Sequence, residues 1–161
     1  MTAITGGCQC GSVRFRAEEL GRASICHCRM CQKAFGSFFG PLVTAKHLVW
    51  TRGEPARYAS SNVVKRGFCA NCGTPLTFEY PGGIDAAIGA LDDPELAPPA
   101  IEVGRQGKLS YFATLHLLPG RPDNEVEAHE AYLRSVVSNQ HPDHDTDSWP
   151  PQGGASAPAR S

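Results

Sequence analysis

Seven cysteines in three short clusters are the residues of this 161-residue chain whose types and spacing could do chemistry. They are Cys8 and Cys10, then Cys26, Cys28 and Cys31, and finally Cys69 and Cys72. Cysteines so close in sequence are poorly placed to bridge one another, because a relaxed disulfide needs particular Cα separations and Cβ directions. Their sulfurs can instead converge on a soft metal ion. A closed tetrahedral zinc site takes four protein ligands and a catalytic one takes three, so the count predicts two Zn²⁺ per chain, one structural and one reactive.

The first and third clusters are predicted to share the structural zinc. Two residues separate Cys69 from Cys72, so a tight turn can point both sulfurs at one ion. Gly73 permits the positive φ that such a turn often requires. Cys8 and Cys10 lie on the same face of an extended segment and can supply the other two sulfurs. A redox dithiol is the competing interpretation of Cys69 and Cys72, but a thioredoxin-like pair would be followed by a helix, which this sequence does not predict.

The middle cluster, Cys26-His-Cys-Arg-Met-Cys31, holds three thiols within six residues. In an extended segment the side chains of Cys26 and Cys28 lie on the same face, and a turn after them can bring Cys31 to the same ion. The fourth corner is then left for water or a substrate. His27 alternates away from the sulfurs, so we expect it to pack or to hydrogen-bond behind the site.

Spacing alone also allows the cysteines to be divided differently between the two metal sites. Cys28 and Cys31 could join Cys69 and Cys72 in a zinc ribbon with two paired knuckles. The remaining three cysteines would then form a second, poorer cluster.

Three thiolates donate strongly to Zn²⁺ and leave it a weaker Lewis acid than three imidazoles do, so water activation is not its natural role. A soft cation among sulfurs prefers another sulfur as its fourth ligand. A small thiol bound there is stabilised as a thiolate, which is the nucleophilic form. The predicted chemistry is addition of a thiol to an aldehyde carbon, or the reverse cleavage of the carbon–sulfur bond.

Short glycine-punctuated strands must position these clusters. Alternation or β-rich composition predicts strands at 12–17, 38–44, 47–51, 76–80 and 84–88, each bounded by turn residues. A helical turn is expected from Arg29 to Phe35, ended by Gly36 in the left-handed region.

The C-terminal part of the chain differs in composition. We expect residues 1–122 to form a zinc-binding domain and residues 123–138 to form a helix packed on it. This helix would be capped by Asp123 and would use an apolar face that includes Val126 and Leu133. Residues 139–161, rich in Pro, Gly, Ala and Ser, are expected to be a disordered tail.

Composition excludes two classes of partner. Net charge is −1, and no block of Lys and Arg is present, which disfavours binding to nucleic acid. No stretch approaches the ~20 apolar residues that span a bilayer. Free or metal-bound thiols and an N-terminus without a secretory signal predict a cytoplasmic protein.

Three segments resemble the blocks of the glutathione-dependent formaldehyde-activating enzyme (GFA) family, whose domain is shared with centromere protein V. They are Gly6-Gly-Cys-Gln-Cys-Gly-Ser-Val-Arg-Phe15, Cys26-His-Cys-Arg-Met-Cys-Gln-Lys33, and Arg66-Gly-Phe-Cys-Ala-Asn-Cys-Gly-Thr-Pro-Leu76. The resemblance implies a mainly β fold, the Mss4-like β-tent of curved antiparallel sheets around zinc. It also implies that the first and third blocks form the structural zinc site, and that the middle block is catalytic.

The sequence therefore predicts a zinc-dependent carbon–sulfur lyase acting on thiol–aldehyde adducts such as S-hydroxymethylglutathione. Glutathione carries two carboxylates, so nearby cations are candidate substrate contacts. They are Arg29, Lys33, Lys65 and Arg66, which could equally be solvated surface charges. The alternative function is a non-catalytic zinc-binding interaction module, as the domain shared with centromere protein V suggests.

Overall fold

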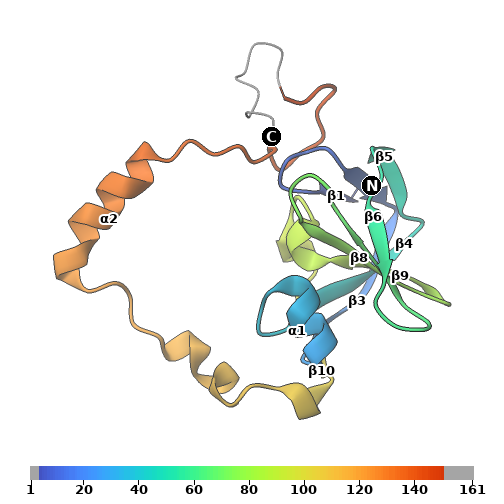
Figure 1. Ribbon diagram of the computed structural model, residues 1–161, viewed down its shortest axis with the longest axis horizontal. Coiled ribbons are helices and arrows are strands. Elements are labelled where there is room, and N and C mark those ends of the chain that lie inside the picture. Colours follow the sequence, from blue (N-terminus) through green and yellow to red (C-terminus); the bar gives the residue numbers. More distant parts are fainter. Residues whose placement is uncertain (1–3, 151–161) are drawn as a thin grey trace.

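Two β-sheets form the body of the protein (Figure 1). The computed structural model describes residues 4–150, and residues 1–3 and 151–161 lie outside the described range. The smaller sheet has the order β1 (Ile4–Gly7), β2 (Arg14–Ala17) and β5 (Val49–Arg52). The larger sheet has the order β10 (Ile101–Val103), β3 (Glu19–Cys26), β4 (Gly40–Lys46), β9 (Gly83–Ala87), β8 (Pro75–Tyr80), β7 (Lys65–Phe68) and β6 (Ala56–Ala59).

Neighbouring strands are antiparallel except for β10, which pairs in parallel with β3. The predicted mainly β class is confirmed, and β2, β4, β5, β8 and β9 overlap the five predicted strands. The specific β-tent architecture stays a prediction. The short strands β1, β6, β7 and β10 and the longer β3 were not predicted.

The larger sheet has two chemically different faces. Cross-strand pairing aligns Gly67, Thr77, Ala86 and Val43 on one face, and the last three are buried. This face packs against the smaller sheet, where Phe15 is fully buried. Because successive residues point to opposite faces, the neighbouring row lies on the other side of the sheet. That row contains Arg66, Phe78, Asp85 and Thr44.

The predicted helical turn between β3 and β4 is confirmed as α1 (Arg29–Phe35). Cys28 is its N-cap, and the Cys28 sulfur accepts a hydrogen bond from the backbone N–H of Cys31. Gly36 ends the helix with φ of 57°, a left-handed conformation that costs glycine little because it has no Cβ.

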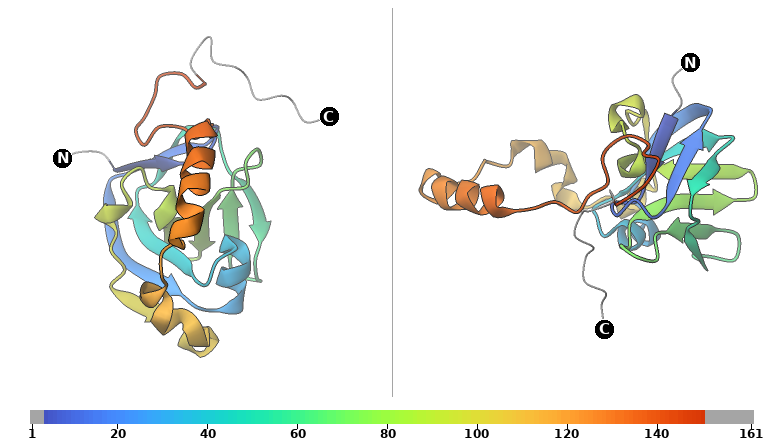
Figure 2. Two further views of the ribbon diagram at one scale, coloured as in Figure 1. Left: turned by 90° about the vertical axis from the view of Figure 1, so that its left-hand side faces the viewer. Right: turned by 90° about the horizontal axis from the view of Figure 1, so that it is seen from above.

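Beyond β10 the chain leaves the sheets as an extended excursion (Figures 1 and 2). η3 (Arg105–Gly107) still lies against α1, where the Gly107 carbonyl accepts from Gln32, and the excursion then comprises η4 (Ser110–Leu117) and α2 (Asp123–Ser135). η1 (Ile88–Ala90) and η2 (Pro94–Leu96) lie earlier, after β9. The C-terminal helix thus forms, but it buries none of its residues, and Leu133 is 53% exposed. The structure therefore does not show the expected packing on the domain. The apolar stripe of α2 is narrow and charged residues flank it, so packing the helix on the domain would bury little apolar area.

After α2 the chain returns to the sheets. His141 is buried at 3% exposure, and its backbone N–H donates to the carbonyl of Gln9 at 2.7 Å. A few specific polar and aromatic contacts hold residues 140–149, and the expected disorder of residues 139–161 stays a prediction. Residues 151–161 lie outside the described residues. Within residues 4–150, no helix combines the length and apolar character needed to cross a bilayer.

Candidate metal centres and thiol pocket

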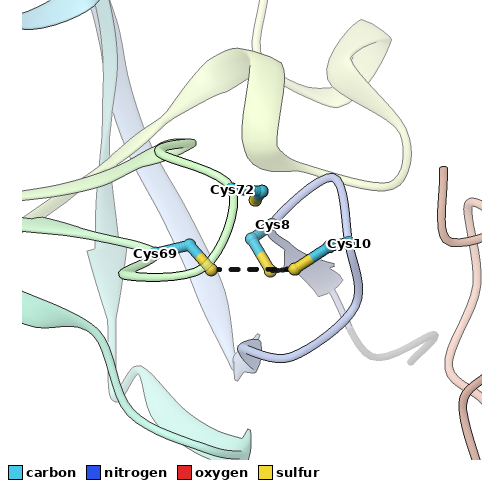
Figure 3. Close-up of side chains that lie close together, drawn as sticks. All are labelled: Cys8, Cys10, Cys69 and Cys72. Carbon is cyan, nitrogen blue, oxygen red and sulfur yellow. Dashed lines mark hydrogen bonds between the residues drawn. The ribbon is translucent and has the colours of Figure 1, made fainter. Parts of the chain in front are cut away.

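The first and third cysteine clusters meet at one point, where two loops face each other (Figure 3). All four sulfurs, those of Cys8, Cys10, Cys69 and Cys72, lie within 4.8 Å of one another. The Sγ atoms are 3.6 Å apart between Cys8 and Cys10, and 3.8 Å apart between Cys10 and Cys69. Four sulfurs placed tetrahedrally at about 2.3 Å from a zinc ion would be about 3.8 Å apart, so the cluster has the dimensions of a closed metal site.

Local hydrogen bonds shape both loops around these sulfurs. The backbone N–H of Val13 donates to Cys8 Sγ at 3.2 Å, and that of Gly73 donates to the Cys69 carbonyl at 2.8 Å. Burial raises the pKa of Cys8 to about 12, so a thiolate there requires a cation beside it. At Cys72 burial also opposes ionisation, but hydrogen bonds, foremost from Thr74, outweigh it and lower the pKa to about 6.

The middle cluster forms a separate group at the end of β3 and the start of α1. The sulfurs of Cys26, Cys28 and Cys31 lie within 4.8 Å of one another. The structure therefore does not bring Cys28 and Cys31 together with Cys69 and Cys72, as the ribbon alternative would require. Burial raises the pKa of Cys26 to about 12. At Cys28 burial also opposes ionisation, but hydrogen bonds, foremost from the backbone N–H of Cys31, outweigh it and lower the pKa.

Gly104 allows η3 to close against this cluster. Its φ is 62°, and a Cβ at this position would lie 2.9 Å from the backbone nitrogen of Cys28 and 3.4 Å from Cys26 Sγ. Any side chain would therefore press on the loop that carries two of the three sulfurs.

A pocket of about 210 Å³ opens over the middle cluster. Its floor is the non-core face of the larger sheet, and its walls come from β3, α1 and the loop after β6. The lining comprises Ser24, Cys26, Cys28, Met30, Cys31, Leu42, Ser60, Ser61, Val64, Arg66, Phe78, Asp85 and Val103. The three sulfurs are thus exposed to a mainly apolar cavity, whereas the four-sulfur cluster joins two loops.

Among the predicted substrate contacts, Arg66 lies inside this pocket. Its side chain is 4% exposed, and its Nη2 donates to Cys31 Sγ at 3.3 Å. Its Nε donates to the Ser60 hydroxyl at 2.9 Å, and its guanidinium lies 4.9 Å from the centre of the Phe78 ring. Its Nη1 is buried and has no hydrogen-bond partner among the described residues. The structure thus leaves one buried donor of this arginine unused beside the sulfurs.

The other three predicted cations are exposed. Arg29 and Lys33 line an open groove next to the pocket, and Met30 and Ser60 belong to both cavities. Lys65 lies by a different depression, with Glu79 and Tyr80, and is not brought to the cysteines.

His27 packs behind the middle cluster, as expected from its alternation. It is fully buried, its ring centre is 4.7 Å from that of Phe112, and its Nε2 is 3.6 Å from Glu102 Oε1. The ring packs edge-on and is kept away from the pocket.

Sequence reasoning missed the pocket residues that β8 and β9 contribute. Phe78 and Asp85 lay in predicted strands, but no role was assigned to either of them. Pairing places both beside Arg66 across β7, β8 and β9. The only local signal was an aspartate inside an otherwise apolar strand, Gly83–Ala87.

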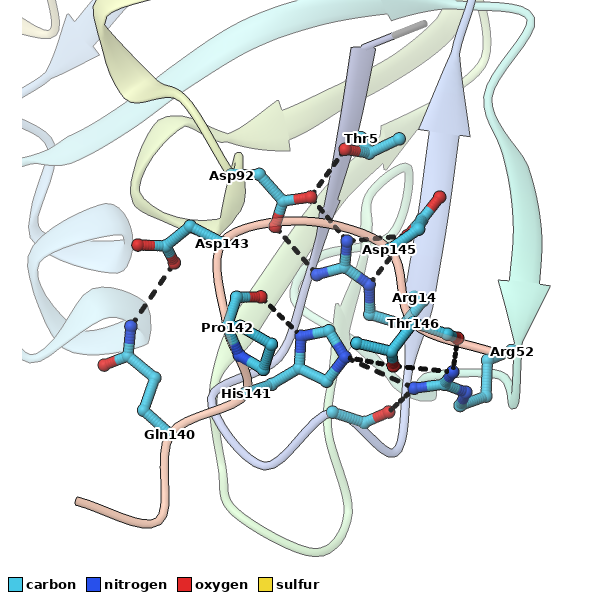
Figure 4. A network of polar contacts seen from close by, with 11 residues as sticks. Thr5, Arg14, Arg52, Asp92, Gln140, His141, Pro142, Asp143, Asp145 and Thr146 are labelled. Carbon is cyan, nitrogen blue, oxygen red and sulfur yellow. Dashed lines mark hydrogen bonds and ion pairs between the residues drawn. The ribbon is translucent and has the colours of Figure 1, made fainter. Parts of the chain in front are cut away.

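A polar network that sequence reasoning also missed ties the C-terminal segment to the domain (Figure 4). Arg14, buried at 3% exposure, pairs with Asp92 through Nη1 at 2.8 Å and with Asp145 through Nη2 at 2.7 Å. Arg52 donates to the hydroxyl of Thr146 at 3.1 Å. These contacts hold residues 140–146 next to the loop that carries Cys8 and Cys10.

Fold and site define a mainly β domain with two cysteine clusters positioned to bind metal ions, one closed and one opening into a pocket. The chain belongs to the glutathione-dependent formaldehyde-activating enzyme family, which matches residues 3–105. This confirms the resemblance found from the cysteine blocks.

Two individual proteins are similar to this chain. The chain is 36% identical over 85 residues to an uncharacterized lyase of Schizosaccharomyces pombe, a match that covers 52% of this chain and 62% of that protein. It therefore spans about three fifths of this curated relative. A crystal structure of a Rhodobacter sphaeroides protein superposes with a TM-score of 0.51 at 23% identity, over 62% of this chain and 99% of that one. That likeness concerns the fold alone.

Proposed function

We propose that this protein is a zinc-dependent carbon–sulfur lyase that forms or cleaves adducts between a small thiol and an aldehyde. The observation that carries the proposal is the group of three sulfurs, from Cys26, Cys28 and Cys31, that opens into a mainly apolar pocket. A zinc ion bound there would supply a soft cation that favours a thiolate over a thiol. Membership of the family and the similarity to a protein named as a lyase support the same class of reaction.

The chain's own residues would bind and orient the substrate. The pocket of about 210 Å³ suits the reacting end of a small thiol. The adjoining groove carries Arg29 and Lys33, whose charges suit the carboxylates of a peptide-like thiol such as glutathione. The buried Nη1 of Arg66 is a free donor for an oxygen of the adduct.

At the other cluster, Cys8, Cys10, Cys69 and Cys72 would hold a zinc ion that stabilises the fold. It would join the β1–β2 loop to the β7–β8 loop. With four protein sulfurs it would leave no position for a substrate.

Cobalt substitution tests the proposal. Two equivalents of Co²⁺ per chain are expected, and adding glutathione should change the sulfur-to-metal charge-transfer band in the wild type. Cys28→Ser, which alters the three-sulfur cluster, should lose this response, whereas an exposed control, Ser138→Ala, should keep it. A protein that binds one cobalt, or two with no response to any small thiol, would contradict the assignment.

One observation favours the alternative, a non-catalytic interaction module. The excursion formed by η4 and α2 exposes large apolar side chains, including Leu118, Tyr132 and Val137. In that case both ions would be needed for folding, and neither would respond to thiols in the cobalt experiment.

A further inference from the structure

Asp85 is the only carboxyl group among the described residues that line the thiol pocket. It lies on β9, and strand pairing places it between Phe78 of β8 and Thr44 of β4. On the same face of the sheet, Leu42 pairs with Ser24, and Cys26 follows Ser24 by two residues. The sheet therefore directs the Asp85 carboxyl and the sulfur of Cys26 toward the same cavity.

An aspartate in this position needs an explanation, because a carboxylate loses solvation among apolar groups. Asp85 makes no ion pair with any residue in the described range 4–150, and Arg66 of the same pocket donates through Nε to Ser60 and through Nη2 to Cys31. The hydroxyl of Tyr80 donates a hydrogen bond to Asp85 Oδ1 at 3.4 Å. Burial raises the pKa of Asp85, and hydrogen bonds from Thr44 and Tyr80 only partly oppose this rise.

The proposed reaction needs a group of this kind. A thiol enters with a proton on sulfur, and the aldehyde oxygen must gain a proton when the adduct forms. None of the three cysteines can serve, since all three are needed as thiolates for the metal. A carboxyl group that accepts one proton and returns it meets both needs.

We propose that Asp85 is the acid–base residue of the thiol pocket, an inference that rests on the proposed function. As carboxylate it takes the proton from the thiol S–H. The sulfur lone pair then forms the carbon–sulfur bond, the π electrons of the carbonyl move to oxygen, and that oxygen takes the proton back from Asp85. The net change is thiol plus aldehyde to hemithioacetal, and the reverse sequence cleaves the adduct.

Arg66 has a complementary positioning role in this scheme. Its unused Nη1 can donate to the aldehyde oxygen as negative charge develops there. Asp85 then supplies the proton, and Arg66 holds the oxygen in place to receive it.

The first test compares a variant that removes the ionisable carboxyl group with one that removes only the hydrogen bond from Tyr80. Asp85→Asn keeps the shape but cannot take a proton, and Tyr80→Phe keeps the carboxyl group. With glutathione and formaldehyde at pH 7, Asp85→Asn should slow catalysed adduct formation at least ~100-fold, and Tyr80→Phe only a few-fold. Asp85→Glu should restore part of the activity, and the exposed control Asp123→Asn should match the wild type. Equal losses in Asp85→Asn and Tyr80→Phe would mean that Asp85 is structural, and would overturn the proposal.

The second test does not depend on turnover. Calorimetric binding of glutathione, measured in buffers of different ionisation enthalpy, counts the protons released. If Asp85 captures the thiol proton, Asp85→Asn should release about one more proton per bound thiol than the wild type. The groups that face Asp85 and could share the proton are Tyr80 on β8, Thr44 on β4, Arg66 on β7, Cys26 on β3, and Cys28 and Cys31 at α1. Equal proton release would overturn the proposal even if the variant is less active.

The experiments distinguish the proposed function of the protein from the proposed role of Asp85. If the wild type binds no thiol at the three-cysteine cluster, the proposed function fails. If the wild type binds thiol and forms the adduct but Asp85→Asn does so equally well, only the role of Asp85 fails. Metal content and thermal unfolding of each variant show whether a loss reflects misfolding.

Discussion

Arg66 Nη2 donates a hydrogen bond to Cys31 Sγ at 3.3 Å, which links β7 to α1 across 35 residues of sequence. Arg66 is 4% exposed and Cys31 is 2% exposed, so solvent screens this contact little. Burial raises the pKa of Cys31, and the hydrogen bond and charge of Arg66 oppose that rise. The arginine therefore makes a thiolate at this position easier to form and to keep.

Replacing this arginine should weaken metal binding at one cluster only. Arg66→Gln removes the charge, so the pKa of Cys31 should rise further, and the three-cysteine cluster should bind Co²⁺ about 10-fold more weakly. Competition with a chromophoric chelator measures the effect. Arg57→Gln, on the neighbouring β6, is the matched control, because Arg57 pairs with Glu79 outside the pocket. An equal loss at both clusters would instead indicate a general disturbance of the fold.

The two clusters should respond differently to loss of one sulfur. Cys72→Ser opens the site that joins two loops, and metal binding at such a site contributes ~10 kcal/mol or more to folding. This variant should therefore fail to give a cooperative thermal transition. Cys28→Ser should lose activity but unfold within a few degrees of the wild type. Circular dichroism melts with metal analysis check both, and a stable Cys72→Ser protein would contradict the structural assignment.

The sequence predicted these clusters well because their information is local. Two-residue gaps between Cys69 and Cys72, and the alternation of Cys8 and Cys10, already bring sulfurs together. The turn from Arg29 to Phe35 and its stop at Gly36 likewise depend only on neighbours.

The rest of the pocket depends on pairing between distant strands. Arg66 faces Phe78, and Phe78 faces Asp85, only once β7, β8 and β9 are in register. A shift by one residue would turn all three side chains to the core face. No local pattern fixes that register, so Asp85 could not be assigned a role from sequence.

The buried ion pair between Arg14 and Asp92 should make stability depend on pH in a defined direction. Burial alone would raise the pKa of Asp92, but the hydrogen bonds and charge of Arg14 outweigh it, and the folded-state pKa is lowered. The stabilisation is then complete above the ordinary pKa of aspartate, and it is lost as pH falls through the lowered value.

Asp92→Asn tests this dependence. At pH 7 it should destabilise the protein by about 3 kcal/mol, because it leaves the Arg14 charge short of a buried partner. The difference from the wild type should shrink as pH falls below about 4. Urea unfolding of the wild type and the variant at each pH measures this difference in stability. Any metal loss that affects both proteins equally cancels in the comparison. Asp93→Asn, at an exposed neighbour, is the control, and a pH-independent difference would exclude the ion pair as its cause.

His141 should determine whether the C-terminal segment stays on the domain. Its ring is buried at 3% exposure and packs edge-on against Trp149, with centroids 5.0 Å apart. His141→Ala should release residues 140–149, at a cost of about 1–2 kcal/mol. Hydrogen exchange should then rise at the backbone amide of His141, which donates to Gln9. His144→Ala, at an exposed position, should leave exchange unchanged, and unaltered exchange in His141→Ala would rule out this anchoring role.

The sequence could not foresee this docking, because the Pro- and Ser-rich composition of residues 139–161 resembles that of unstructured chains. The contact depends on a surface that exists only after folding, where the Gln9 carbonyl accepts from the backbone N–H of His141 and Gly11 lies against its ring. The composition of the segment carries no information about the surface of the folded domain that it contacts.

The excursion that carries α2 is attached to the domain at both of its ends, by β10 pairing with β3 and by His141 on the loop of Gln9. A protease cut within α2 would consequently leave two fragments that stay associated and migrate together until they are denatured. The same arrangement makes α2 a suitable place to open new chain ends or insert a reporter, since neither sheet would be interrupted.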